Sequence, residues 1–179
     1  MAITKSLRPI ILKMQEDIKF KRLKETFSTL ALYQIPIEEL TKEVETLHKM
    51  REIRRLNTQD PAFVDQLIKA NTNDQSIRGR LTEIMMTCIR ASSRLQTAVD
   101  ALKHHLLLTH GETLKSFRTK EERGYIVNMA LVSFTRYLDN VSSLKECTQL
   151  IIGDIDKGSW SIRTSIDGLK MHMDRERHI

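Results

Sequence analysis

The fold is decided by residues 77–105, which read IRGRLTEIMMTCIRASSRLQTAVDALKHH. Such a stretch is typical of a helix whose apolar side chains lie along one side, as in the seam of a coiled coil. It therefore predicts a long helix, about four heptads in length, that packs against another helix. The residues of this first seam recur at alternating spacings of four and three: Ile77, Leu81, Ile84, Cys88, Ala91, Leu95, Ala98, Leu102 and His105.

A second seam of the same kind lies between residues 127 and 155. Between the seams, His110-Gly111 predicts the end of the first helix, and Thr119-Lys-Glu-Glu122 matches a capping box at the start of the second. Two seams of similar length with a short connector predict an antiparallel helical hairpin. The residues of the second seam are Val127, Ala130, Phe134, Tyr137, Val141, Leu144, Thr148, Ile151 and Ile155.

The flanking segments predict further helices around this hairpin. Residues 1–56 are expected to form N-terminal helices, and residues 57–75 a short helix between polar breaks. Residues 76–179 contain the long antiparallel hairpin and a short C-terminal helix. The prediction is an all-α protein of one domain, an elongated helical bundle that forms a homo-oligomer through its heptad-patterned helices.

Several polar or small residues are expected to end helices. The segments 57–61 and 71–74 are rich in Asn, Thr and Asp, and each predicts a break. Gly158 is expected to close the second long helix, and Ser159 to cap the next one. Trp160 is then expected to pack its indole against the end of the preceding helix and fix the angle of the terminal helix.

Composition excludes several other classes of protein. The 179 residues include only six Gly and three Pro, and 5% are aromatic, which argues against a β-sandwich or barrel. Neither GxGxxG nor GxxxxGK(S/T) occurs, so a Gly-rich nucleotide-binding loop is not expected. The N-terminus lacks signal-peptide features and no apolar stretch is long enough to span a bilayer, so a cytoplasmic protein is expected. Cys88 and Cys147 lie in apolar helical patterns, which favours two buried thiols over a disulfide.

The residues that carry enzyme chemistry form no recognisable site. No nucleophile lies in a motif such as GxSxG, and paired carboxylates occur only where helix capping and solvation explain them. The histidines at 104, 105 and 110 lack the spacing of a zinc site, and the acidic residues of 154–156 lack the last ligand of a calcium loop. We therefore expect a protein that is not an enzyme and uses no cofactor or metal.

The net charge of +6 lies in the first two thirds of the chain. Arginine is frequent among these cations, and its planar guanidinium favours bidentate contacts with phosphate. Few aromatic residues lie near the basic clusters, so contacts with the nucleic-acid backbone are expected to dominate over base stacking. The residues predicted to bind nucleic acid are Arg51, Arg54, Arg55, Arg78, Arg80, Arg118, Lys120 and Arg123.

The segment 144–170 resembles the C-terminal segment of the UvsY family of phage recombination mediators. In that family a long helix ends near a small residue, an aromatic residue follows, and an Ile-Lys/Arg step leads into a short terminal helix. The resemblance implies a small, basic, all-helical protein that forms ring-like oligomers, binds single-stranded DNA and helps load a recombinase onto strands coated by single-stranded-DNA-binding protein. The matching positions here are Gly158, Trp160, Ile162-Arg163 and Lys170.

Two functions therefore remain open. The first is a non-enzymatic, single-stranded nucleic-acid-binding oligomer, an accessory factor whose partners are the nucleic acid, further copies of itself, and a recombinase or single-stranded-DNA-binding protein. The second is a structural or adaptor protein that assembles within a virion or large complex. Arginines gathered on one side of the assembly favour the first function, and arginines paired with carboxylates between subunits favour the second. A membrane partner is not expected.

Overall fold

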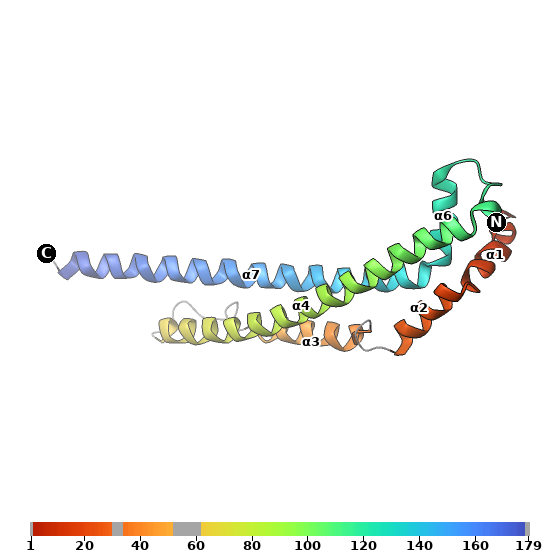
Figure 1. Ribbon diagram of the computed structural model, residues 1–179. Helices are drawn as coiled ribbons and strands as arrows, with labels where there is room; N and C mark the ends of the chain where they lie inside the picture. The colour runs from red at the N-terminus through yellow and green to blue at the C-terminus, as the bar shows by residue number, and fades with distance from the viewer. Residues whose placement is uncertain (1, 30–33, 52–61, 178–179) are drawn as a thin grey trace. The chain divides into compact units, whose positions relative to one another are not determined.

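The computed structural model describes residues 2–29, 34–51 and 62–177 of the chain. Regular structure in these ranges is entirely helical and includes no strand (Figure 1). None of the helices there is both long and apolar enough to cross a membrane. The predicted all-α class is confirmed. The helices are α1 (Ala2–Gln15), α2 (Ile18–Thr29), α3 (Ile37–Lys49), α4 (Phe63–Thr109), α5 (Gly111–Leu114), α6 (Lys120–Ala130) and α7 (Val132–Arg177).

The chain divides into two compact units, each with residues from several parts of the sequence. Unit 1 comprises residues 1–37 and 87–143, and unit 2 comprises residues 38–86 and 144–179. The two long helices, α4 and α7, each continue from one unit into the other. Unit 1 adds α1, α2, α5 and α6 to its stretches of α4 and α7, whereas unit 2 adds α3.

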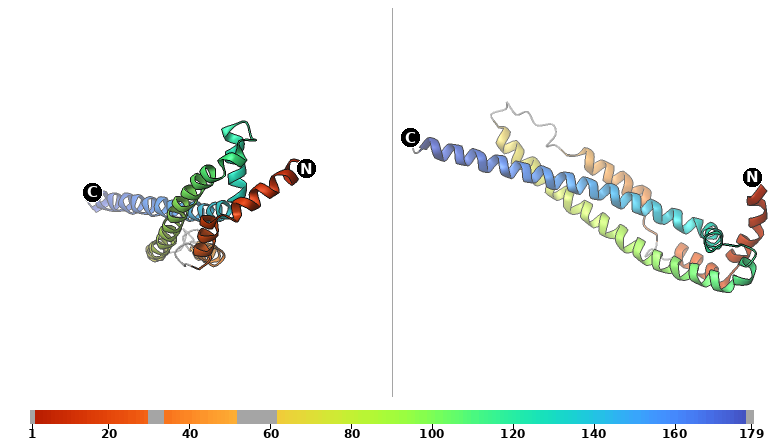
Figure 2. Two further views of the ribbon diagram at one scale, coloured as in Figure 1. Left: turned by 45° about the vertical axis from the view of Figure 1, so that its right-hand side comes forward. Right: turned by 90° about the horizontal axis from the view of Figure 1, so that it is seen from above.

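In unit 2, α4 and α7 lie side by side and run antiparallel (Figure 2). Arg78 of α4 bonds to Asp156 of α7, and Gln75, one turn earlier in α4, bonds to Ser159, one turn later in α7. A lower residue number in α4 thus corresponds to a higher number in α7. This direction agrees with the predicted antiparallel pairing of the two long helices.

Helix α4 continues through one of the predicted breaks. The polar segment 71–74 lies inside α4, so the expected break there is wrong. Its side chains find partners in the tertiary structure: Asp74 accepts a hydrogen bond from Arg51, and Asn71 accepts one from Ser159. Polar side chains with such partners no longer compete with the helix for backbone groups. The other predicted break, 57–61, lies outside the described residues.

Helix α7 also continues where the sequence predicts its end. Gly158 is helical, so the expected short terminal helix is not a separate element. Ser159 is buried and bonds to Asn71 and Gln75 instead of capping a new helix. Trp160 is 70% exposed, so its predicted packing against a helix end is wrong. A glycine lowers helix stability by only about 1 kcal/mol relative to alanine, which surrounding contacts can offset.

The buried side of α4 departs slightly from a strict heptad pattern. Ala98 and His105 are only partly buried, and Val99 and Leu106 take their places in the core. A straight α-helix has 3.6 residues per turn, so its buried side drifts away from a 3.5-residue repeat. Both cysteines are free, but Cys147 is exposed, so the prediction of a buried thiol holds only for Cys88. The buried residues of α4 within unit 1 are Cys88, Ala91, Leu95, Val99, Leu102 and Leu106.

Aromatic rings join α2 to α7 in the core of unit 1. Phe134 of α7 makes edge-to-face contacts with Phe20 and Phe27 of α2, at ring-centroid distances of 5.7 and 5.5 Å. Phe27 also contacts Tyr137 at 5.0 Å. The Tyr137 hydroxyl accepts a hydrogen bond from the backbone N–H of Ile35 at 2.8 Å. These contacts hold both α2 and Ile35 against α7.

Asp17 holds the junction between α1 and α2. Its Oδ1 accepts hydrogen bonds from the backbone N–H groups of Lys19 and Phe20, at 2.8 and 3.3 Å, and so caps α2. Its Oδ2 lies 3.2 Å from Nε2 of His105 in α4. Burial on its own would raise the pKa of Asp17, but the hydrogen bonds from Lys19, His105 and Phe20 outweigh it, and the pKa lies below its ordinary value of 3.8.

Replacing Asp17 with alanine is expected to lower the free energy of unfolding by about 1–2 kcal/mol at neutral pH, because α2 loses its cap. Since the folded-state pKa is lowered, the carboxylate stabilises the fold above about pH 4, and this contribution is lost as the pH falls through the folded-state pKa. Urea unfolding of wild type and Asp17→Ala at several pH values should therefore give a difference that shrinks with acid. Asp139→Ala, on an exposed residue of the same unit, is the control. A difference independent of pH would contradict this role.

Candidate nucleic-acid interface

The positive charge of the protein belongs to unit 1. The residues of unit 1 include 15 Lys and Arg against 8 Asp and Glu, a net charge of +7. The residues of unit 2 include 14 against 15, a net charge of −1. Unit 1 therefore accounts for the whole excess of +6, a result that a division of the sequence into thirds hides because α4 and α7 belong to both units.

Arg51, a predicted phosphate ligand, is buried in unit 2. Its Nε donates to Asp74 at 3.0 Å and its Nη1 donates to Asp154 at 2.6 Å. The side chains of Arg51 and Asp74 are only 4% and 1% exposed. Burial on its own would lower the pKa of Arg51, but the hydrogen bonds to Asp154 and Asp74 raise it above its ordinary value. Arg51 thus ties the end of α3 to α4 and α7, and its guanidinium faces carboxylates rather than solvent.

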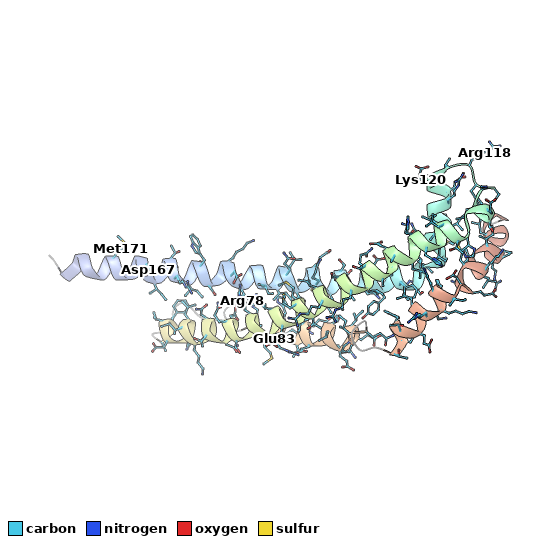
Figure 3. The ribbon with its side chains drawn as sticks, in the orientation of Figure 1. Arg78, Glu83, Arg118, Lys120, Asp167 and Met171 are labelled. Atoms are coloured by element: carbon cyan, nitrogen blue, oxygen red, sulfur yellow. The ribbon has the colours of Figure 1, made fainter. Side chains whose placement is uncertain are left out.

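Arg78 and Arg80 also face carboxylates of unit 2. Arg78, labelled in Figure 3, makes a bidentate contact with Asp156 at 2.6 and 3.1 Å. Arg80 makes a bidentate contact with Glu43 of α3 at 2.6 and 3.1 Å and a further bond to Glu83 at 2.8 Å. These hydrogen bonds raise the pKa of both arginines and lower the pKa of Asp156 and Glu43. A phosphate at these arginines would compete with a carboxylate that already occupies the bidentate edge of each guanidinium.

The predicted capping box is present at the start of α6. The hydroxyl oxygen of Thr119 accepts a hydrogen bond from the backbone N–H of Glu122 at 3.1 Å. The Glu122 carboxylate in turn accepts from the backbone N–H groups of Arg118 and Thr119, at 2.9 and 3.3 Å. The connector of residues 115–119 is therefore anchored to α6 at the point where the predicted basic residues begin.

The other predicted cations lie around this connector. Arg118 and Lys120 are exposed and lie on either side of Thr119, the N-cap of α6; both are labelled in Figure 3. Neither forms an ion pair with any described residue. Arg123 is half-buried, and its Nε donates to the backbone carbonyl of Phe117 at 3.0 Å. These three residues thus lie on the connector and the first turn of α6, and Arg123 helps to hold the connector. Arg54 and Arg55 lie outside the described residues.

A groove of about 590 Å³ lies beside these cations, between α1 and α6. Two of its side chains are aromatic, and Tyr125 is 61% exposed. The sequence carries a signal for this arrangement, because Phe117 and Tyr125 lie on either side of the basic segment 118–123. The groove is lined by Leu7, Phe117, Glu121, Glu122, Tyr125 and Ile126.

Three of the predicted residues, Arg51, Arg78 and Arg80, pair with carboxylates of unit 2, and the prediction left out other cations that unit 1 exposes. The omitted residues lie on α1, α2, α4 and α7, and none of them forms an ion pair with a described residue. Some of them are visible as clusters in the sequence, since four cations lie within residues 19–24 and Arg90 and Arg94 are four positions apart. Their membership of one basic unit becomes visible only when the tertiary structure assigns residues to units. These exposed cations are Arg8, Lys13, Lys19, Lys21, Arg22, Lys24, Arg90, Arg94 and Arg136.

The fold and the site together define an all-helical protein with one strongly basic unit. No family model matches the chain, no curated protein matches it, and no solved structure matches it.

Proposed function

We propose that this protein is a non-enzymatic, single-stranded nucleic-acid-binding oligomer that acts as an accessory factor in recombination or replication. The observation that carries the proposal is the net charge of +7 on unit 1, much of it on exposed side chains. Lys and Arg side chains that neutralise phosphates release bound counterions, which drives association with nucleic acid. Exposed Tyr125 beside these cations adds an aromatic surface of the kind on which unpaired bases stack.

The proposed binding surface differs from the one that the sequence favoured. Arg51, Arg78 and Arg80 have carboxylate partners in unit 2, so a strand would compete with those partners. At Arg118 and Lys120 a strand would not have to compete with a carboxylate partner, because neither residue forms an ion pair with a described residue. The proposal therefore centres on the connector of unit 1 and extends to the exposed cations on α1, α2, α4 and α7.

Self-association is part of the proposal. Large apolar side chains of α7 are exposed in unit 2: Leu150 is 76%, Trp160 70% and Met171 63% exposed. An assembly of copies would cover these side chains, and the proposal of self-association takes them together with the resemblance of residues 144–170 to the ring-forming UvsY family. Light scattering of the full chain at micromolar concentration is expected to give a mass above that of the 20.8 kDa monomer. A strictly monomeric mass would contradict this part of the proposal.

The choice of recombination comes from the resemblance of residues 144–170 to the UvsY family, whereas nucleic-acid binding comes from the charge. Helix α7 continues past Gly158, where the family's long helix ends, so this part of the resemblance is absent from the structure. Under the proposal, the protein partners are a recombinase or a single-stranded-DNA-binding protein.

An adaptor that assembles within a virion or large complex is the second candidate. The observation that favours it is the same exposure of Leu150, Trp160 and Met171, which suits protein contacts as well as self-association. The net charge of −1 on unit 2 also gives that unit no general attraction to nucleic acid. The two candidates differ in whether unit 1 binds a strand.

The deciding experiment is fluorescence anisotropy of a labelled oligo(dT) strand titrated with the full chain at salt concentrations from about 50 mM upward. Affinity is expected to fall steeply with salt, since bound counterions are released. The double change Arg118→Ala, Lys120→Ala should weaken binding and reduce the salt slope by about 1.4, roughly 0.7 for each lost phosphate contact on a single strand.

The matched control is Arg78→Ala, Arg80→Ala, which removes the same amount of charge from unit 2. It is expected to leave affinity and salt slope close to those of the wild type, because both arginines face carboxylates. Circular dichroism of each variant checks that the helices are intact. If the two double variants weaken binding equally, the surface on unit 1 is wrong. If the wild type fails to bind at 50 mM salt, the adaptor function replaces the proposed one.

A further inference from the structure

We infer that the groove between α1 and α6 holds one unstacked nucleobase, with Tyr125 as its stacking surface and with Arg118 and Lys120 on the adjacent phosphates. The inference rests on the proposed function, and it specifies what part of the strand enters unit 1. The scarcity of aromatic residues near the basic clusters predicted that contacts with the nucleic-acid backbone dominate. This groove adds a contact that depends on the presence of a base.

The size and lining of the groove suit a planar apolar ligand. Its volume of about 590 Å³ lies within the range of roughly 300–1,000 Å³ that is typical of small-molecule sites. Leu7 and Ile126 belong to the buried core, with 8% and 2% exposure, and supply fixed apolar surface. Tyr125 is 61% exposed, so its ring is available for stacking.

The groove is held in place before any ligand binds. Phe117 donates its backbone N–H to Leu114 at 3.0 Å and accepts from Arg123 Nε at its carbonyl, also at 3.0 Å. Glu122 holds the next residue, Arg118, through that residue's backbone N–H at 2.9 Å. A site whose backbone is already fixed loses little conformational entropy on binding.

The charged residues around the groove are of both signs. Glu121 and Glu122 line the groove with exposed side chains, and their carboxylates would repel a phosphate placed beside them. Arg118 and Lys120 are adjacent in sequence to the lining residues Phe117 and Glu121, and both are exposed. A neutral base in the groove is not repelled by the two carboxylates, and the phosphates next to that base can contact Arg118 and Lys120. These flanking cations favour a nucleic-acid strand over an apolar protein segment as the occupant.

The test compares two labelled strands of the same length and charge, oligo(dT) and an abasic strand that carries phosphates and sugars but no bases. Tyr125→Ala is expected to weaken binding of oligo(dT) about tenfold, because base–aromatic stacking contributes on this scale. Binding of the abasic strand should not change. The salt slope should also stay the same, because the substitution removes no phosphate contact.

Two variants serve as controls for Tyr125→Ala. Tyr125→Phe keeps the ring and should retain affinity within about twofold of the wild type, as expected for stacking on a π-face. Leu108→Ala removes an apolar side chain that is 70% exposed elsewhere in unit 1, and it should leave binding unchanged. Because Tyr125 and Leu108 are both largely exposed, all three variants should fold as the wild type does, which circular dichroism checks.

The outcomes separate this inference from the proposed function. If the wild type binds both strands equally, or if Tyr125→Ala weakens both equally, the base-binding groove is wrong and the proposed function stands. If Tyr125→Ala lowers the mass of the assembly without changing oligo(dT) affinity, the groove is a contact between copies of the chain and the inference is overturned. If neither strand binds at about 50 mM salt, the proposed function itself fails.

Discussion

Replacing Arg51 with alanine is expected to lower the free energy of unfolding by about 3–5 kcal/mol, because it leaves a buried charge without its partner. Asp74 is 1% exposed at its side chain, and Arg51 is the partner of its Oδ2. The other oxygen, Oδ1, is buried without a hydrogen-bond partner in the described structure. Loss of Arg51 would therefore leave both oxygens of the Asp74 carboxylate buried in unit 2 without a hydrogen-bond partner.

Urea unfolding followed by circular dichroism measures this loss. Arg78→Ala is the matched control, since it removes an arginine from an exposed ion pair, and such pairs contribute at most about 1 kcal/mol. The double variant Arg51→Ala, Asp74→Ala removes both buried charges and should recover part of the stability lost in Arg51→Ala. Arg51→Ala with the stability of Arg78→Ala, or a double variant no more stable than Arg51→Ala, would contradict the buried-pair interpretation.

The second large effect is expected for Phe134→Ala, which should also lower the free energy of unfolding by about 3–5 kcal/mol. Phe134 is 2% exposed and its ring contacts Phe20 and Phe27 edge-to-face. The substitution would leave a cavity at the place where α2 packs on α7. Amide hydrogen exchange in α2 should accelerate, because this helix loses an anchor in unit 1.

Val132→Ala is the control for Phe134→Ala on the same helix. Val132 is 48% exposed, so truncation there is expected to change stability by less than about 1 kcal/mol. Urea unfolding compares the two variants, and hydrogen exchange locates the change. If Phe134→Ala destabilises the protein no more than Val132→Ala, then Phe134 does not anchor α2.

Much of the fold follows from local sequence pattern. The all-α class follows from the seams and the scarcity of Gly and Pro, and the start of α6 follows from Thr119 and Glu122. Two features of α4 and α7 do not: the segment 71–74 and Gly158 predict ends, yet both lie inside helices. The segment 71–74 stays helical because its polar side chains find partners, such as Arg51 for Asp74, that come from other parts of the chain.

Some features of the candidate site could also be predicted from the sequence, and others could not. The grouping of Arg118, Lys120 and Arg123 was predictable, because these residues lie within six positions of one another. The pairing of Arg51 was not, since Asp74 and Asp154 are 23 and 103 positions away. Nor could the sequence show that unit 1 carries all the excess charge, because its residues come from two separate stretches.

The sequence by itself determined that this protein is helical and where its cations lie along the chain. The tertiary structure alone decided which of the described cations have carboxylate partners and which are exposed without one. The physical reason is the distance along the sequence over which each interaction acts. Helix formation depends on hydrogen bonds between backbone groups four residues apart and on the spacing of nearby apolar side chains. Charge compensation depends on which helices pack together, and that brings distant residues such as Arg78 and Asp156 within 2.6 Å of each other.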